Sequence, residues 1–215
     1  MASADARSAP DTAADGDPSD LPELAADCAA CAALCCVGLA FDKGAEFAID
    51  KPAGKPCPNL SGHACTIHAD LAARGFPGCA RFDCEGAGQR SVALHGGASW
   101  RDDPDVLSPM LDTFRHLRRI HELLNLLVVA GRLPLGPDHE RERRSLVAAL
   151  CPQDMTPGLA ATLATGPIPG RARAFFRDLR REMQPLRAAT DQPTSSERPT
   201  RRRAPCPSPQ ARSRT

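Results

Sequence analysis

The sequence predicts a mainly α-helical protein, in which a small cysteine-rich module with a short β-hairpin precedes a helical bundle. Eight of the ten cysteines lie in the first half of the chain, whereas apolar residues recur at helical spacing in the second half. Aromatic residues make up only 4%, which favours helices packed through small side chains. We therefore divide the 215 residues into an N-terminal tail (1–24), the cysteine module (25–100), the helical bundle (101–185) and a C-terminal tail (186–215).

Both tails are predicted to be disordered, because they are rich in Pro, Ala, Ser and Thr and contain almost no large apolar side chains to offset the entropy of ordering. The N-terminal tail is acidic, and the C-terminal tail is rich in arginine. The N-terminus lacks the basic start and apolar run of a secretory signal, and the longest apolar stretch, 123–130, is too short to cross a membrane. We expect a cytoplasmic protein without a membrane partner.

The clustered cysteines have the spacing of a metal-binding segment. They begin as Cys-x2-Cys-x3-Cys-Cys and, after a gap of 20 residues, continue as Cys-x7-Cys-x13-Cys-x4-Cys. Thiolates this closely spaced bind zinc or an iron-sulfur cluster, and in a reducing cytosol they seldom form disulfides. The candidate metal ligands are Cys28, Cys31, Cys35, Cys36, Cys57, Cys65, Cys79 and Cys84. The spacing leaves open two four-thiolate zinc sites, a zinc site beside a 4Fe-4S cluster, or one site with spare cysteines.

The cysteine module is expected to contain short elements that carry its thiols. A helix or helical turns are predicted within residues 21–41, a short strand over 45–50 and a small hairpin within 57–68. At helical pitch, Cys28, Cys31 and Cys35 would share one face of the helix. Because the module has few apolar residues, we expect it to need a metal, which in small domains contributes about 10–16 kcal/mol to folding.

Four helices are predicted in the second half of the chain. The first has Ser108 as its N-cap and Pro109 at its first position, and it ends at Gly131. Its apolar stripe consists of Met110, Phe114, Leu117, Ile120, Leu124 and Leu127. The other three are expected over 138–150, after a Thr156 cap and from Pro169. We expect these helices to pack on one another and on the cysteine module.

Other polar residues near the thiols have plainer interpretations. His63 and His68 can each replace a thiolate, but with eight cysteines present a surface role or a role in orienting a ligand is favoured. Five basic residues either offset the negative charge of the thiolates or form a solvated loop face. They are Lys43, Lys51, Lys55, Arg74 and Arg81.

Two apparent motifs are rejected. His121-Glu122 is followed by Asn125 where a metalloprotease helix needs a second histidine, so His121 is assigned to helix packing. The Gly86-Ala-Gly-Gln segment lacks the third glycine of a nucleotide-binding loop and predicts a tight turn. Neither Cys151 nor Cys206 has a partner at ligand spacing. No catalytic residue is assigned, because no nucleophile, base or phosphate loop stands out.

Several strings resemble known bacterial families. CxxCxxxCC, CPNL, CTIH and CARFDC resemble cysteine-cluster proteins described as zinc- or iron-chelating domains, whose relatives include a flagellin lysine N-methylase. CAALCCVGLAF, FAIDKPAGKPCPNL and RGFPGCARFDCEGAGQ are similar to the cysteine-rich N-terminal region of a subset of pentapeptide-repeat proteins. The likeness covers about residues 28–135 and implies metal binding by the eight clustered cysteines. The repeats themselves are absent, since the A-[DN]-L-x-x pattern occurs as a single match at residues 69–73.

These observations lead to two hypotheses about function, from different classes. The first is an intracellular metal-binding protein that acts as a structural or interaction module for a protein partner. The alternative, implied by the methylase relatives, is an iron-sulfur redox or methyl-transfer accessory enzyme. Binding of nucleic acid through the arginine-rich tail is disfavoured, because that tail has no interleaved aromatic residues.

Overall fold

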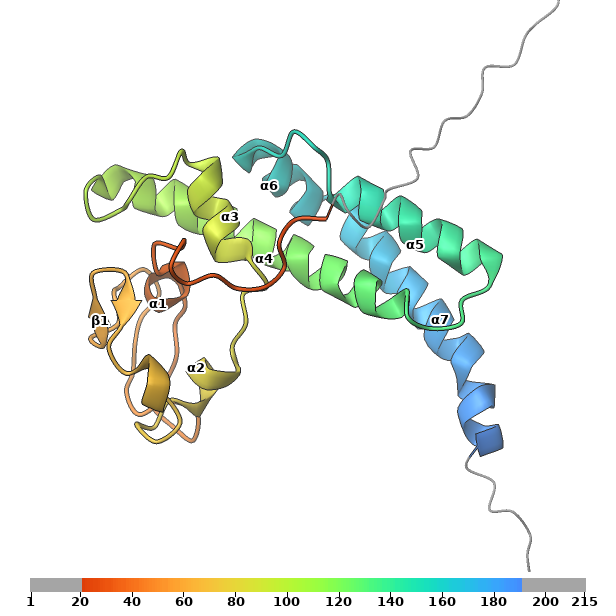
Figure 1. The fold of residues 1–215 in the computed structure, drawn as a ribbon, viewed down its shortest axis with the longest axis horizontal. Helices are drawn as coiled ribbons and strands as arrows, with labels where there is room; N and C mark the ends of the chain where they lie inside the picture. The colour runs from red at the N-terminus through yellow and green to blue at the C-terminus, as the bar shows by residue number, and fades with distance from the viewer. Residues whose placement is uncertain (1–20, 191–215) are drawn as a thin grey trace, which may run out of the picture. The chain divides into compact units, whose positions relative to one another are not determined.

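Helices make up most of the regular structure in residues 21–190, which the computed structural model describes (Figure 1). The elements are α1 (Leu34–Gly38), β1 (Leu60–Ser61), β2 (Ala64–Cys65), η2 (His68–Asp70), α2 (Pro77–Arg81), α3 (Ala87–Leu94), η3 (Pro104–Val106), α4 (Leu107–Ala130), α5 (Pro137–Leu150), α6 (Pro157–Thr165) and α7 (Ile168–Thr190). The chain divides into two units, one ending at Leu179 and one beginning at Arg180, and of the second only the end of α7 is described. The predicted mainly α-helical class is confirmed. The predicted tails lie largely outside the described residues.

Helix α4 carries the core of the first unit. All six residues of the predicted apolar stripe are buried along it, together with Leu111, Thr113, His121 and Ala130. The predicted N-cap is wrong: the helix begins at Leu107, directly after η3, and Asp103 rather than Ser108 caps that preceding turn by accepting from the Asp105 N–H. Gly131 ends the helix as predicted. The amphipathic pattern was therefore sufficient to locate this element to within a residue or two.

The helices α5, α6 and α7 were also predicted, and α5 and α6 pack on α4. Helix α6 begins at Pro157, and its Thr156 cap accepts from the Leu159 N–H. The first part of α7 is joined to α5 by the Arg171 to Glu142 ion pair. Buried Leu146, Leu150, Ala160, Ala164 and Ala172 show that small side chains fill much of this core. No helix within residues 21–190 is long and apolar enough to cross a membrane.

Of the two forms predicted for the first cysteine segment, a helix or helical turns, the structure has turns followed by one short helix. Only Leu34–Gly38 is helical, and Ala33 just before it has a left-handed backbone with φ of 55°. A helix cannot pass through that conformation. Cys28 and Cys31 therefore lie in turns ahead of α1, so the prediction that they share one helical face with Cys35 is wrong.

The predicted strand over 45–50 is also absent. That stretch forms a turn in which the Gly44 N–H donates to the Phe47 carbonyl, and an isolated bridge pairs Phe41 with Lys51. The predicted hairpin is present: Leu60 pairs with Cys65 and Ser61 with Ala64, across a turn with Gly62 at a φ of 57°. Glycine is suited to that left-handed turn position.

The cysteine module contacts α4 through α1 and α3 (Figure 1). Helix α3 was not predicted; it starts after Gly86, at a φ of 77°, where the sequence suggested only a tight turn. Leu34 and Val37 of α1 are fully buried, and a side chain at Gly38 would collide with Leu111 of α4, at 2.8 Å. The module is thereby held close to the central helix by backbone packing.

Candidate metal centre

The eight clustered cysteines gather within the module although they come from separate segments. Seven are partly buried, Cys28 is exposed, and none is in a disulfide. Within residues 21–183, however, no three Cys, His, Asp or Glu side chains stand close enough together to hold a metal ion. The thiols are therefore neighbours that do not form a closed ligand shell.

Cys31 and Cys84 meet beside α3. Gly88 makes their approach possible, since a Cβ atom there would lie 2.6 Å from the Cys31 Sγ and 3.6 Å from the Cys84 Sγ. A Cβ at 2.6 Å from a sulfur atom is not tolerated without a shift, so the absence of a side chain at Gly88 leaves room for the Cys31 sulfur. The Cys84 sulfur lies within van der Waals distance of the same point, so both thiols approach the same residue of α3.

Cys28 is brought to the same place by the side chain of Gln89. The side-chain N–H of Gln89 donates to the Ala25 carbonyl at 2.8 Å, and the side-chain oxygen of Gln89 accepts from the Asp27 N–H at 3.2 Å. These two bonds hold the segment before Cys28 against α3. The Cys31 N–H then donates to the Cys28 carbonyl at 3.4 Å, which closes a turn between the two cysteines.

A second group of cysteines lies around the base of the hairpin. The Cys57 N–H donates to the Cys36 carbonyl at 3.0 Å, and the Leu60 N–H donates to the Cys57 carbonyl at 3.0 Å. Leu60 is in turn the strand partner of Cys65. Cys79, on α2, lies near enough that the charges of Cys36, Cys57 and Cys65 all raise its pKa, after the larger effect of burial.

The adjacent residues Cys35 and Cys36 connect the two groups of cysteines. Their sulfur atoms are 3.9 Å apart and share a hydrogen bond. This bond lowers the pKa of Cys36 to about 7, assisted by the positive charge of Lys51, whereas the same bond and burial raise the pKa of Cys35. One thiolate is therefore favoured at this pair near neutral pH.

Burial is the largest effect on two further thiols and raises the pKa of both Cys31 and Cys65. The backbone near Leu34 and Ala33 acts in the opposite direction on Cys31, and the backbone near Ile67 does so on Cys65. Backbone dipoles of this kind favour the thiolate form that binds metal.

Lys51 was one of five basic residues with two competing interpretations, and it is the buried one. It is 4% exposed, and its ammonium donates to the carbonyls of Val37, Leu39 and Pro52 at 3.0, 2.5 and 3.2 Å. Burial lowers its pKa, and the charges of Cys57 and Cys36 act in the opposite direction. The other four (Lys43, Lys55, Arg74 and Arg81) are exposed, as a solvated loop face requires. A fixed positive charge thus lies beside the hairpin thiols.

The two histidines of the hairpin region, His63 and His68, belong to no group of side chains in the described residues that can hold a metal ion. The Nε2 atom of His63 is 3.2 Å from the Ser99 Oγ, and its ring lies edge-on to Trp100. His68 lies in η2 and is exposed. Trp100 itself is buried and donates to the Ala32 carbonyl at 2.7 Å, so His63 belongs to the packing around the turn before α1.

A polar link joins the residue after Cys84 to α4, and no sequence pattern predicted the part played by Glu85. Glu85 follows Cys84 with a left-handed φ of 51°; its carbonyl lies 2.6 Å from the His121 Nδ1 and its Oε1 accepts from Asn125 at 3.0 Å. Since a carbonyl only accepts, the Nδ1 atom of His121 carries the hydrogen. His121 is buried, as predicted for a packing residue, and has a specific polar partner that spacing alone could not reveal.

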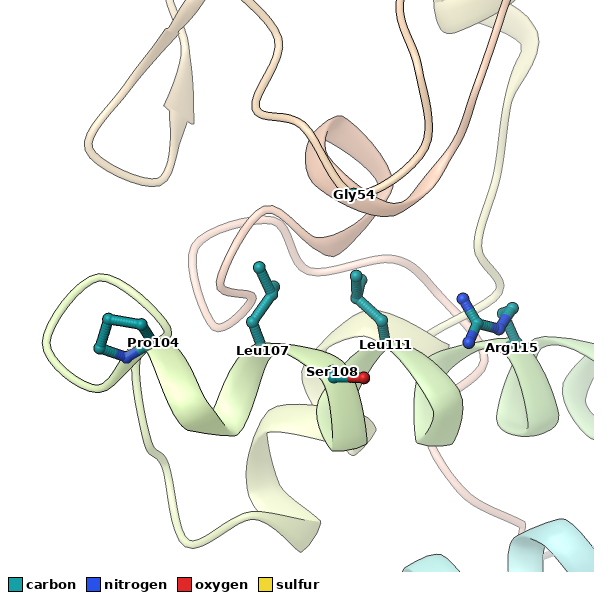
Figure 2. A pocket seen from close by; sticks show the side chains of 6 residues that line it. All are labelled: Gly54, Pro104, Leu107, Ser108, Leu111 and Arg115. Carbon is teal, nitrogen blue, oxygen red and sulfur yellow. The ribbon is translucent and has the colours of Figure 1, made fainter.

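A separate hollow lies between the module and α4, away from the thiols. It encloses about 270 Å³ and is lined by Gly54, Pro104, Leu107, Ser108, Leu111 and Arg115. Figure 2 shows Leu107 and Leu111 pointing from α4 toward the loop that carries Gly54. The charged residue in this lining, Arg115, is paired with Asp112. The lining therefore offers no arrangement of nucleophile and base.

Comparison with known proteins gives one similar relative here. The chain is 45% identical over 125 residues to YybG of Bacillus subtilis, an uncharacterized protein. The match covers 57% of this chain and 45% of YybG, so the chain spans less than half the length of that relative. No family model and no solved structure matches the chain. The resemblance to the cysteine-rich region of pentapeptide-repeat proteins accordingly stays a prediction.

Proposed function

We propose that this protein binds metal through its clustered cysteines and acts as a structural or interaction module rather than as an enzyme. The observation that carries the proposal is the set of eight free thiols, seven of them partly buried, in a module with few buried apolar side chains. The approach of Cys31 and Cys84 to Gly88 and the backbone bonds that link Cys36, Cys57 and Cys65 support it. The ligands would be Cys28, Cys31, Cys35, Cys36, Cys57, Cys65, Cys79 and Cys84.

Zinc or an iron-sulfur cluster suits this donor set, since both favour thiolate ligands. A zinc ion held by four thiolates has no open position, so it would contribute to folding and not to a reaction. The chain's own residues would hold the thiolates and set the charge around them. A protein partner and a cytoplasmic location belong to the same proposal, because reduced thiols persist in the cytosol.

The test is to purify the full chain without oxygen and to measure zinc, iron and acid-labile sulfide per chain together with the visible spectrum. Zinc in a colourless protein supports the structural module. Iron with sulfide supports metal binding and moves the redox alternative ahead of the structural one. A well-folded protein without metal, which also fails to take up Zn²⁺ or iron on reconstitution, would show the proposal to be wrong.

A further inference from the structure

We infer that the eight thiols form two separate four-thiolate sites, one from Cys28, Cys31, Cys35 and Cys84 and the other from Cys36, Cys57, Cys65 and Cys79. This inference rests on the proposed metal binding and assigns the ligands within it. The first set is called the α3 site and the second the hairpin site.

The α3 site is defined by contacts made through one helix. Gly88 of α3 admits the sulfur atoms of Cys31 and Cys84, and Gln89 of α3 holds the segment that leads into Cys28. A side chain at Gly86 would meet the Glu23 carbonyl at 2.1 Å, so this segment also lies directly against the start of α3. Three of the four thiols are therefore positioned by consecutive residues of α3.

The hairpin site is defined by backbone hydrogen bonds. Cys36 is joined to Cys57, and Cys57 is joined through Leu60 to Cys65. Cys79 lies on α2, which is fastened to the turn at residues 44–47, where the Gly78 N–H donates to the Glu46 carbonyl at 3.1 Å. The thiols whose charges act on Cys79 are Cys36, Cys57 and Cys65, all of them members of this site.

Of the adjacent cysteines in α1, Cys35 is assigned to the α3 site and Cys36 to the hairpin site. Consecutive residues of a helix differ by about 100° in direction, so adjacent side chains leave α1 on different sides. The charges of Cys31 and Cys84 act on Cys35 after that of its neighbour Cys36, whereas Cys36 interacts with Lys51, which lies beside the hairpin thiols. The 3.9 Å between the two sulfur atoms places the sites next to each other.

The two sites differ in their surrounding charge. Lys51 interacts with three of the four hairpin thiols, Cys36, Cys57 and Cys79, and with Cys35. The pKa of Cys28 of the α3 site is raised first by burial, then by the charges of Cys84 and of the neighbouring site's Cys36, and also by the negative charges of Asp27 and Asp83. A divalent metal held by four thiolates forms a centre with a net charge of minus two, and each thiol still protonated gives its proton to solvent when the metal binds. We therefore expect the hairpin site to bind metal more tightly than the α3 site.

The ligand division is tested by anaerobic titration of the full chain with Co²⁺, which reports four-thiolate coordination by its sulfur-to-cobalt absorption. Wild type should bind two equivalents. Cys31→Ser/Cys84→Ser and Cys57→Ser/Cys65→Ser should each retain one, and the mixed variant Cys65→Ser/Cys84→Ser should retain none in four-thiolate form. Cys151→Ser, outside both sites, is the matched control and should behave as wild type.

The outcomes separate the two proposals. If wild type binds Co²⁺ but takes only one equivalent, or if the mixed variant keeps one complete site, the division is wrong while metal binding stands. If wild type takes up no Co²⁺, metal binding itself is wrong. Because serine variants can unfold, Cys65→His and Cys84→His provide a second readout: each should alter the spectrum of one of the two cobalt ions, and the double variant should alter both. A double variant that alters one ion alone would overturn the division.

Discussion

At the scale of single residues, Glu85 has the most constrained position next to the candidate ligands. It follows Cys84 directly, and its backbone and side chain are both fastened to α4, through His121 and Asn125. Its second carboxylate oxygen, Oε2, is buried without a hydrogen-bond partner. An unpartnered buried oxygen costs free energy, so the remaining contacts of Glu85 have to hold it in place. The position of Cys84 therefore depends on two residues of the central helix.

Replacing His121 by Leu should lower the free energy of unfolding by about 1–3 kcal/mol, because it leaves the Glu85 carbonyl buried without its donor. The measurement is urea unfolding at neutral pH, with metal content held equal. Arg119→Leu, at an exposed position of the same helix, is the control and should change stability by less than about 0.5 kcal/mol. Equal effects of the two variants would contradict a specific role for the His121 contact.

The same variant should have a pH-dependent effect. Burial lowers the pKa of His121 below its ordinary 6.5, although the bond to Glu85 acts in the opposite direction. Below about pH 6.5 the unfolded chain binds this proton and the folded chain does not, so wild type loses stability as the pH falls toward the pKa of the folded state. The stability difference between wild type and His121→Leu should therefore shrink between about pH 7 and pH 5. A constant difference would show that folding does not shift the pKa of His121, and a difference that grows as the pH falls would show that folding raises it.

At the scale of elements, the sequence predicts a helix correctly where a single local pattern determines it. The stripe from Met110 to Leu127 specifies which face of α4 is buried, and packing obeys it. Thr156 before a proline specifies the start of α6 through a single side-chain bond. The same reasoning failed at Ala33, because alanine has no sequence signal for a left-handed backbone and is the best helix former. The sequence therefore could not decide between a helix and helical turns over 21–41, where the backbone at Ala33 imposes a turn.

The candidate site also has features that the sequence predicts and features that depend on the fold. Eight cysteines at short spacing identified the segment, but their grouping depends on Gly88, Gln89 and the hairpin register, which are long-range contacts. The role of Lys51 was equally open, since burial of one lysine among five basic residues cannot be deduced from a single sequence. Local patterns predict local structure, and the arrangement of distant segments needs the fold.

Gly88→Ala should weaken metal binding even though alanine is favoured in helices by about 1 kcal/mol over glycine. The new Cβ would stand 2.6 Å from the Cys31 Sγ and would displace that sulfur. We expect a loss of Co²⁺ affinity of at least about tenfold, measured by competition with a chelator. Gly158→Ala in α6, where nothing lies within 4 Å of the new Cβ, is the matched control and should leave affinity unchanged. An unchanged affinity in Gly88→Ala would mean that the space at α3 holds no metal.

Glu140 connects α5 to the end of α4. It accepts two bonds from Arg143 at 2.7 Å and one from Arg144 at 2.9 Å, and Arg143 reaches the Leu127 carbonyl at 3.4 Å. The bond to Arg143 is the largest reason that the pKa of Glu140 falls to about 2. Because the pair is only partly shielded from water, its contribution is about 0.5–1 kcal/mol.

Glu140→Gln should therefore lower the free energy of unfolding by about 0.5–1 kcal/mol at neutral pH. The folded pKa is depressed, so this contribution is present above about pH 4.5 and is lost as the pH falls toward 2. Thermal unfolding at several pH values measures the difference from wild type. Glu122→Gln, at an exposed position of α4, serves as the control. A difference that does not decline in acid would show that the ion pair is not its source.

At the scale of the whole first unit, two regions rely on different sources of stability. The helices α4 to α6 share a continuous core that includes Phe114, Leu124, Leu146 and Ala160. The cysteine module contributes few buried apolar side chains, chiefly Leu34, Val37, Leu71 and Phe76. Small modules with so little buried surface usually need a metal or a disulfide, and none of the clustered cysteines is in a disulfide.

Removal of metal by a strong chelator should therefore unfold the cysteine module and spare the helices. Hydrogen exchange measured by mass spectrometry on the full chain should show protection lost across residues 28–84 and largely retained in α4, α5 and α6, because their core does not include the thiols. Far-ultraviolet circular dichroism should change little, since the module contains only short helices. The Cys57→Ser/Cys65→Ser variant should resemble chelator-treated wild type around the hairpin and stay protected near α3. Loss of protection in α4 and the module together, in one transition, would instead mean that the two regions fold as a single cooperative unit whose stability depends on the metal throughout.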